Sequence, residues 1–211
     1  MDCMGMTGQN DFSPGLSGQD GKMKGLIDKI SLYAQGVLEE KRFRHSVRVA
    51  EYAASLSEVY SVDKEAAYLA GISHDICKNS KDRLLLSLAK RDGDPILDIE
   101  KKKPSLLHGR AGAVLLKEDF GVEDQEVLEA VKNHTFGIPG ASDLTLLIYV
   151  SDKIEPGRGY NAGSLREIAG NVPLRVLALE TAKECLRILE LQKKSVSPGT
   201  LDMIKWLETH D

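Results

Sequence analysis

Hydrophobic residues recur at helical spacing along almost the whole chain after residue 22. In residues 44–60, His45, Val49, Tyr52 and Leu56 lie at positions i, i+4, i+7 and i+11, which places them on one stripe of one helix. Gly, Pro and Asn occupy the gaps between such stretches, and neither β-type alternation nor an internal repeat is evident. The pattern predicts helices over residues 24–39, 44–60, 63–76, 80–91, 108–119, 123–134, 142–153, 174–193 and 198–208. We therefore expect an all-α fold in one domain, a single helical bundle.

Residues 1–22 break this pattern. They contain five glycines, together with Ser, Asn, Gln and Pro, and few apolar residues. Such a segment cannot bury enough apolar surface to offset the conformational entropy that it would lose on ordering. We therefore predict that residues 1–22 form a disordered N-terminal extension and that residues 23–211 form the folded domain.

Composition and charge change this picture little. With 42% hydrophobic and 28% charged residues, the chain of 211 residues is typical of an ordinary globular domain. Its net charge of −4 argues against nucleic acid or an anionic membrane as a partner of the whole molecule. The basic runs at 41–44 and 101–103 are either anion sites or solvated helix ends, and we favour solvation, above all for 101–103.

The cysteines and apolar runs indicate a cytoplasmic protein. Cys3, Cys77 and Cys185 are far apart and form no C-x-x-C motif, which argues against a disulfide framework and a structural zinc site and favours a reducing compartment. The longest nearly apolar run, residues 144–150, is too short to span a bilayer. Residues 1–22 lack the features of a secretory signal. We expect no membrane and no nucleic acid as partners, and a homodimer stays open as an alternative to a monomer.

Polar residues interrupt the apolar pattern at a few positions where the helices should be buried. The chain contains two His-Asp pairs. His74-Asp75 follows an apolar run, whereas His210-Asp211 lies at the terminus, where helices fray. Taken singly, each buried histidine is more often a hydrogen-bonded core residue, and an aspartate after an apolar run is often a helix end. The six positions that stand out are His45, His74, Asp75, His108, His134 and Asp152.

As a set, these six residues indicate a metal centre. A buried carboxylate without a partner is costly, and the pattern provides no matching inward Arg or Lys, so a shared cation is the economical explanation. Four imidazoles and two carboxylates are too many ligands for a tetrahedral zinc ion, but they suit two first-row ions that share one carboxylate. Asp75 is the natural bridge, because its neighbour His74 can bind one ion. Paired ions of this kind are used to hydrolyse phosphate esters and anhydrides.

The order His45, His74-Asp75, Asp152 resembles the HD-domain superfamily of metal-dependent phosphohydrolases, and the inserted His108 and His134 are similar to its dinuclear subclass. Several segments more closely resemble the bacterial YqeK family of symmetrical diadenosine tetraphosphate hydrolases. The matching segments are RFRHSVRVAEYA (42–53), HDICK (74–78), LLHGRAGAVLL (106–116), NHTFGIPG (133–140) and LLIYVSDKIEPGR (146–158).

The resemblance implies a role for each matching residue. His45, His74, Asp75 and Asp152 would hold one ion, and Asp75 would bridge to a second ion held by His108 and His134. The ions would be divalent or mixed-valence transition metals, with iron expected and manganese or zinc as alternatives.

Other residues would serve the substrate. Lys78 and Arg158 match positions near the substrate phosphate, so that Asp75, Lys78 and Arg158 form the expected catalytic set; as single residues, Lys78 and Arg158 could equally be surface cations. Glu155 is either a hydrogen-bond acceptor for a ligand histidine or for Arg158, or a helix-end carboxylate.

The chain also departs from the family. Ile138 stands where the family usually has Arg, and Lys153 stands where an aromatic residue is common. Residues 159–161 lack the usual Phe-Pro-Gly after the arginine. Arg110 stands where Pro is usual, so we expect Arg110 to bind substrate in place of the missing cation. These departures concern the substrate more than the reaction class.

The sequence therefore predicts an HD-type metallophosphohydrolase domain over residues 23–211. We expect it to hydrolyse diadenosine tetraphosphate to two ADP through a metal-activated hydroxide at a dinuclear site. Ile138 leaves open a different nucleotide substrate: a dNTP, a nucleoside monophosphate or a cyclic dinucleotide. A non-catalytic nucleotide-binding protein of the same fold is the third alternative, and the six intact ligand positions disfavour it.

Overall fold

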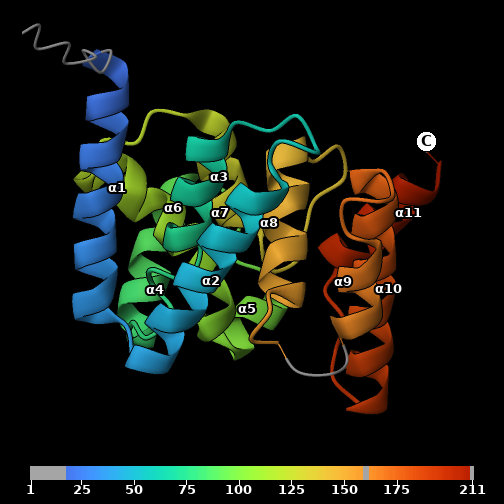
Figure 1. Ribbon diagram of the computed structural model, residues 1–211. Coiled ribbons are helices and arrows are strands. Elements are labelled where there is room, and N and C mark those ends of the chain that lie inside the picture. Colours follow the sequence, from blue (N-terminus) through green and yellow to red (C-terminus); the bar gives the residue numbers. More distant parts are fainter. Residues whose placement is uncertain (1–17, 159–161, 210–211) are drawn as a thin grey trace, which may run out of the picture.

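The computed structural model describes residues 18–158 and 162–209, and within these ranges the chain is helical and contains no strand. The expected all-α fold is thus confirmed. Figure 1 shows the helices gathered into one bundle. The helices are α1 (Gly18–Val37), α2 (Glu40–Leu56), α3 (Lys64–Ser73), α4 (Asp82–Ala89), α5 (Asp98–Lys102), α6 (His108–Asp119), α7 (Gln125–Asn133), α8 (Asp143–Ile154), α9 (Gly163–Ile168), α10 (Leu174–Leu191) and α11 (Pro198–Thr209), with 3-10 turns η1 (Lys90–Asp92) and η2 (Pro104–Leu107).

Some predicted boundaries are wrong. Helix α1 begins at Gly18, so residues 18–22 of the expected N-terminal extension are helical, and residues 1–17 lie outside the described part. Helix α3 ends at Ser73 rather than at residue 76, which leaves His74 and Asp75 in the turn that follows. Helices α5 and α9 were not predicted, because they are too short to repeat an apolar position.

Side-chain caps explain where several helices begin. The Asp63 carboxylate accepts a hydrogen bond from the backbone N–H of Ala66 at the start of α3. Ser142 does the same for the N–H of Thr145 at the start of α8. These two helices carry Asp75 and Asp152 at or just beyond their far ends, so the caps help to fix the position of both carboxylates.

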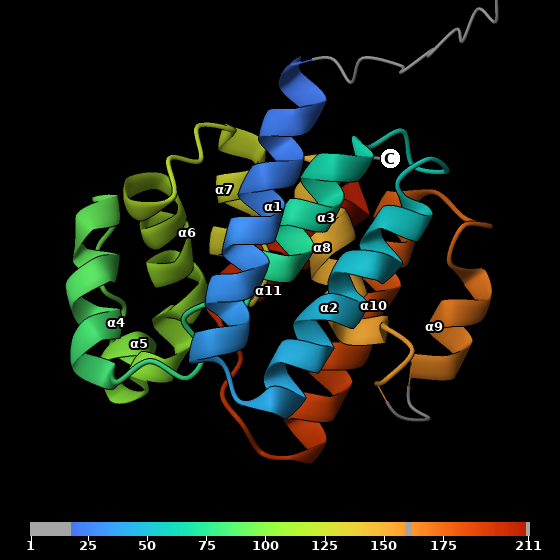
Figure 2. The same ribbon diagram turned by 60° about the vertical axis from the view of Figure 1, so that its left-hand side comes forward.

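Helix α3 lies at the centre of the bundle and packs against α1, α2, α7 and α8. The close crossing of α2 and α3 requires glycine, because a Cβ at Gly71 would lie 2.5 Å from Cα of Ala50. Figure 1 shows α1 on one side of the bundle and α9, α10 and α11 on the other, and Figure 2 shows α1 from the front, with α4 and α5 to its left and α9 to the right. Within the described residues, no helix is long and apolar enough to cross a bilayer.

Candidate metal centre

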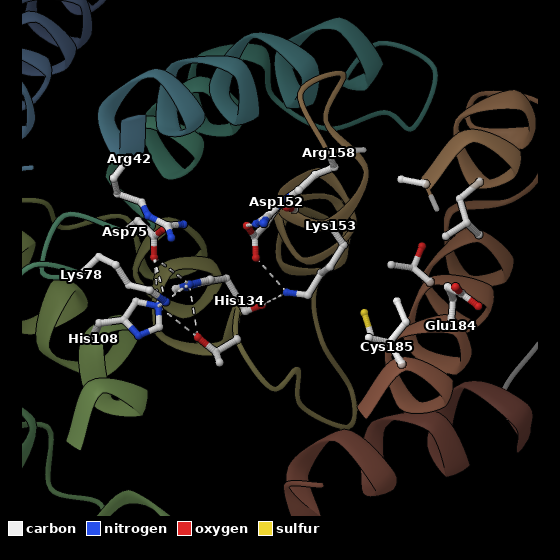
Figure 3. A pocket seen from close by; sticks show the side chains of 15 residues that line it. Arg42, Asp75, Lys78, His108, His134, Asp152, Lys153, Arg158, Glu184 and Cys185 are labelled. Atoms are coloured by element: carbon white, nitrogen blue, oxygen red, sulfur yellow. Dashed lines mark hydrogen bonds and ion pairs between the residues drawn. The ribbon is translucent and has the colours of Figure 1, made fainter. Parts of the chain in front are cut away.

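The structure brings the six candidate ligands together although they come from five parts of the chain. They are supplied by α2, by the turn after α3, by the first residue of α6, by the turn after α7 and by the last turn of α8. All six residues are less than a tenth exposed. Figure 3 shows four of them from the side of the adjoining cavity. The six are His45, His74, Asp75, His108, His134 and Asp152.

Local backbone contacts orient three of the histidines. In His74, His108 and His134, Nδ1–H donates to the carbonyl oxygen three residues earlier, at 2.7, 2.8 and 2.7 Å. Whenever the ring is neutral, this bond leaves Nε2 as the unprotonated nitrogen, and it turns Nε2 toward the interior of the cluster. An imidazole anchored in this way is ready to bind a metal ion through Nε2.

The three Nε2 atoms have few donors among the described residues: the Lys78 ammonium lies 3.1 Å from Nε2 of His108, and the Thr135 hydroxyl is the other. Among the described residues, Nε2 of His74 is buried without a hydrogen-bond partner. Nε2 of His108 and Nε2 of His134 lie only 3.0 Å apart, and the hydroxyl of Thr135 lies 3.3 and 3.2 Å from them. Lone pairs that converge in a buried space are costly unless a cation lies between them. The donor set therefore fits a metal ion.

The Asp75 carboxylate faces two groups of histidines. Its Oδ1 lies 3.0 Å from Nε2 of His108 and 3.7 Å from Nε2 of His134. Its Oδ2 lies 3.4 Å from Nε2 of His74 and 4.0 Å from Nε2 of His45. One carboxylate oxygen is thus directed at each group, which is the arrangement that a bridging ligand requires.

Asp152 completes the group on the Oδ2 side. Its Oδ1 lies 2.9 Å from Nε2 of His45 and 3.7 Å from Nε2 of His74. Two sets of residues have ligand atoms close enough to hold a metal ion: His45, His74 and Asp152, and His74, Asp75 and His134. His108 is adjacent to the second set through its 3.0 Å contacts.

Glu155 holds His45 from the side away from the cluster. Glu155 is 1% exposed, and its Oε1 accepts from Nδ1 of His45 at 3.0 Å. Its Oε2 accepts from Nε of Arg48 at 2.7 Å and from the backbone N–H of Gly157. The sequence predicted a contact with a ligand histidine or with Arg158. The histidine contact is present, and the arginine is Arg48.

These contacts predict how Glu155 affects stability. Burial raises the pKa of Glu155, but Arg48 and His45 outweigh burial and lower it from 4.5 to about 2. Because the folded pKa is the lower one, the stabilisation is fully present above pH 4.5 and is lost as pH falls toward 2. Glu155→Gln should therefore reduce the free energy of unfolding by about 3 kcal/mol at pH 7.

Urea unfolding of the wild type and of Glu155→Gln between pH 7 and pH 3 measures this effect. The difference between the two proteins should shrink as the pH falls below 4.5. Glu123→Gln, at an exposed position, serves as the control and should leave stability unchanged. Equal stability of Glu155→Gln and the wild type at pH 7 would contradict the prediction.

Four basic side chains surround the two aspartates, contrary to the sequence argument that no inward Arg or Lys matched them. Arg42 donates to Oδ2 of Asp75 at 2.8 Å, and Lys78 lies 3.6 Å from Oδ1. On the other carboxylate, Lys153 donates to Oδ2 at 3.0 Å and Arg158 to Oδ1 at 2.6 Å. Arg42 and Lys153 were missed as site residues. Helical spacing could have found Arg42, which lies three residues before His45.

The charges of the cluster keep both aspartates ionised. Burial raises the pKa of Asp75, but the charge of His74 and hydrogen bonds from two other histidines outweigh it, so the pKa lies well below its ordinary value. The pKa of Asp152 is also far below its ordinary value, because Lys153 and His45 outweigh burial. Ionised carboxylates are the form that binds metal ions.

The imidazoles differ among themselves. Burial lowers the pKa of His134 to about 3 and also lowers the pKa of His108. Burial lowers the pKa of His74 as well, but the charges of Asp75 and Asp152 outweigh it, so that this pKa is raised. A proton on His74 therefore competes with a metal ion for the same nitrogen.

The structure places Arg110 away from this cluster, which corrects its predicted role in substrate binding. Arg110 is buried, and its guanidinium donates to Asp92 at 2.7 and 2.8 Å and to Glu100 at 3.0 Å. It also donates to three backbone carbonyls. Arg110 is not among the residues lining the cavity beside Asp75. Its role is to tie α6 to the segment between α4 and α5.

A cavity of about 590 Å³ opens over the cluster; we call it the metal-side cavity. Figure 3 shows Asp75, Lys78, His108 and His134 on one side of it, Glu184 and Cys185 on the other, and Asp152, Lys153 and Arg158 between them. Ile138 packs against the core and is not among the lining residues. Position 138 therefore provides no cation to the metal-side cavity, where the family usually has an Arg. Lys153, by contrast, adds a cation to the wall of this cavity. Residues 159–161 and His210-Asp211 lie outside the described part.

The sequence of the chain is similar to known families over most of its length. A sequence model of the HD domain matches residues 42–157, from α2 to just beyond α8. The symmetrical bis(5'-nucleosyl)-tetraphosphatase of Staphylococcus aureus is 33% identical over 171 residues, which cover 75% of this chain and 87% of that protein. The enzyme of the same name from Bacillus subtilis is 32% identical, over 81% of this chain and 91% of that protein.

A solved structure shows the same fold. It is a predicted HD superfamily hydrolase involved in NAD metabolism from Clostridium acetobutylicum. The two structures agree with a TM-score of 0.82 at 31% sequence identity, over 87% of this chain and 97% of the other. The chain therefore belongs to the HD-domain family, in the group that contains the symmetrical bis(5'-nucleosyl)-tetraphosphatases.

Proposed function

We propose that this protein hydrolyses diadenosine tetraphosphate symmetrically to two molecules of ADP. The observation that carries the proposal is the position of Asp75, whose two oxygens face separate groups of histidines beneath a cavity with four basic side chains. The names of the relatives support the same substrate class.

The site would hold two transition-metal ions. One would be bound by His45, His74 and Asp152, the other by His108 and His134, with Asp75 shared between them. Nitrogen and oxygen ligands without thiolate suit iron, and also manganese and zinc. When bound, such ions lower the pKa of a water molecule and draw charge from phosphate oxygens.

The side chains of the protein position the tetraphosphate. Its negative charge needs several cations, and Arg42, Lys78, Lys153 and Arg158 line the metal-side cavity. Burial lowers the pKa of Lys78 more than the nearby aspartates raise it. The Nζ of Lys78 lies 3.1 Å from Nε2 of His108 and lines the metal-side cavity, where it can contact a phosphate above the cluster.

Symmetrical cleavage fixes the atoms that must react. The oxygen of a water molecule bonds to one of the two inner phosphorus atoms, and the bond from that phosphorus to the central bridging oxygen breaks. The bridging oxygen leaves with the other half, so that each half becomes ADP. One proton of the water passes to solvent, and the other remains on the new terminal phosphate, which ionises according to the pH.

Product analysis tests the proposal. We expect the metal-loaded protein to convert diadenosine tetraphosphate to ADP alone, as measured by anion-exchange chromatography, and we expect a chelator to abolish the reaction. ATP plus AMP as products, or no turnover, would contradict the symmetrical assignment. A panel with a dNTP, a nucleoside monophosphate and a cyclic dinucleotide at the same concentration serves as the control for substrate class.

A further inference from the structure

Two further cavities of more than about 500 Å³ each adjoin the metal-side cavity. The first shares Leu165 and Glu184 with it and lies along α9 and α10. The second has a volume of about 530 Å³ and shares Thr135, Lys153, Cys185 and Ile188 with it. We call the second one the lysine cavity, because Lys102, Lys103, Lys153 and Lys194 line it. Each is large enough to receive part of an extended ligand whose centre lies over the metal cluster.

Charge distinguishes these two cavities. No Asp or Glu is among the described residues that line the lysine cavity. By contrast, the α9–α10 cavity is lined by three glutamates, Glu167, Glu180 and Glu184, with Lys183 and Arg187. Arg187 is paired with Glu184 at 2.7 Å, and Lys183 with Glu208 at 3.2 Å. A phosphorylated ligand is therefore attracted by the lysine cavity and not by its neighbour.

Three of the lysines that line the lysine cavity have no acidic partner among the described residues and can therefore contact a phosphorylated ligand. In the described part of the chain, Lys102, Lys103 and Lys194 make no ion pair, and all three are exposed. Lys101, in the same run, is instead paired with Asp98 at 3.0 Å and does not line the cavity. The run at 101–103, which the sequence indicated to be merely solvated, thus presents two unpaired cations to a cavity.

The walls of the lysine cavity are apolar and partly aromatic. Ile99 and Leu106 come from the α5–η2 segment, and Ile188 and Leu189 come from α10. Phe136, which is only partly buried, offers a ring on which a nucleobase can stack. An apolar wall with an aromatic ring, next to several cations, matches the two halves of a nucleotide.

Lys153 joins the two cavities. Its Nζ donates to the carbonyl oxygen of His134 at 2.6 Å and to Oδ2 of Asp152 at 3.0 Å, and it lies 4.1 Å from the centre of the Tyr149 ring. A chain of phosphates that passes from the metal cluster into the lysine cavity would meet this ammonium on its way.

We propose that the lysine cavity binds the second nucleoside diphosphate half of the dinucleotide, with its base against Phe136 and its phosphates near Lys153, Lys102 and Lys103. This inference rests on the proposed function. The first half then occupies the metal-side cavity. Because part of the lysine cavity is built from α10 and the start of α11, beyond the matched HD domain, the preference for a dinucleotide would depend on residues outside that domain.

Paired serine substitutions test the proposal. Ser195 lines the lysine cavity and Ser164 lines the α9–α10 cavity, and both are exposed, so that tryptophan at either position fills a cavity opening without crowding the core. The first measurement is the number of ADP molecules bound per chain, by equilibrium dialysis of the metal-loaded full-length protein. We expect two in the wild type, two in Ser164→Trp and one in Ser195→Trp.

The second measurement compares substrates with two nucleosides and with one. In Ser195→Trp, the KM for diadenosine tetraphosphate should rise about tenfold, while the KM for adenosine 5'-tetraphosphate should change less than about twofold, because its single nucleoside fits the metal-side cavity. A Lys102→Glu/Lys103→Glu double variant should act in the same direction, and Lys101→Glu should not.

The outcomes separate this inference from the proposed function. One ADP per chain in the wild type, an unchanged count in Ser195→Trp, or a loss in Ser164→Trp instead would overturn the assignment of the cavity. If the wild type bound two ADP but did not cleave diadenosine tetraphosphate, the proposed reaction would fail and the second nucleotide site would stand.

Discussion

Asp75→Asn is expected to abolish both metal binding and hydrolysis. The change keeps the size of the side chain and an oxygen for Arg42, but it removes the charge that serves both groups of histidines. Without that charge, two cations would have to share a site with Asp152 as the remaining aspartate ligand. We expect kcat/KM to fall by about 10³- to 10⁴-fold, which corresponds to several kcal/mol of transition-state stabilisation.

Metal content and kinetics must be measured on the same preparation. Elemental analysis of anaerobically purified protein gives the bound metal, and thermal unfolding shows whether the variant is folded. Asp143→Asn, an exposed aspartate at the start of α8, is the matched control and should behave as the wild type. A folded Asp75→Asn protein that kept its full metal content and activity would exclude Asp75 as the shared ligand.

The six-residue cluster could be predicted because each member interrupts an apolar pattern. His45 begins a stripe of α2 whose other members are buried (Val49) or partly buried (Tyr52 and Leu56), and Asp152 follows the buried stretch of α8. Polar side chains at such positions are informative, because burial is costly for them and needs a compensating partner. Helical periodicity also predicted the long helices, since an apolar stripe that repeats over several turns is typical of an amphipathic helix.

The apolar pattern did not reveal the basic residues of the site: Lys78 and Arg158 were expected from the family resemblance, and Arg42 and Lys153 were missed. Arg42, Lys153 and Arg158 are partly exposed, and cations at partly exposed positions leave no trace in an apolar pattern. Arg110 shows the opposite error, because the sequence placed it near the substrate while the fold buries it against Asp92 and Glu100. Which carboxylate an arginine meets depends on tertiary contacts that spacing along one helix does not encode.

The close packing of α6 against α7 also determines the geometry of the metal centre. The pattern of apolar residues did not predict this packing. His108 and His134 come from α6 and from the turn after α7, and their Nε2 atoms can lie 3.0 Å apart only if these helices are close. Gly109 permits this approach: a Cβ there would lie 2.8 Å from the carbonyl oxygens of both Val131 and Lys132. Both oxygens belong to the backbone of α7 and cannot rotate away.

Gly109→Ala is therefore expected to damage stability and activity together. Alanine favours an α-helix over glycine by about 1 kcal/mol, so the substitution would be stabilising if the methyl group had room. Instead, separation of α6 and α7 should lower the free energy of unfolding by about 1–3 kcal/mol. The carbonyl of Val131 also anchors Nδ1 of His134, so its displacement should reduce kcat/KM by about 10- to 100-fold.

Gly112→Ala, one turn further along α6, separates the clash from the general effect of a methyl group. A Cβ at Gly112 would lie 3.3 Å from Cγ2 of Ile76 and 3.4 Å from Cγ1 of Val131, and these are side-chain atoms that can shift. The control gains helix propensity, but Ile76 and Val131 must shift by a few tenths of an ångström, so urea unfolding should find its stability within about 1 kcal/mol of the wild type. If both variants had wild-type stability and metal content, the approach of α6 to α7 would not be what brings His108 and His134 together. If only Gly109→Ala lost metal, the glycine would be as necessary to the centre as a ligand, although it contacts no ion itself.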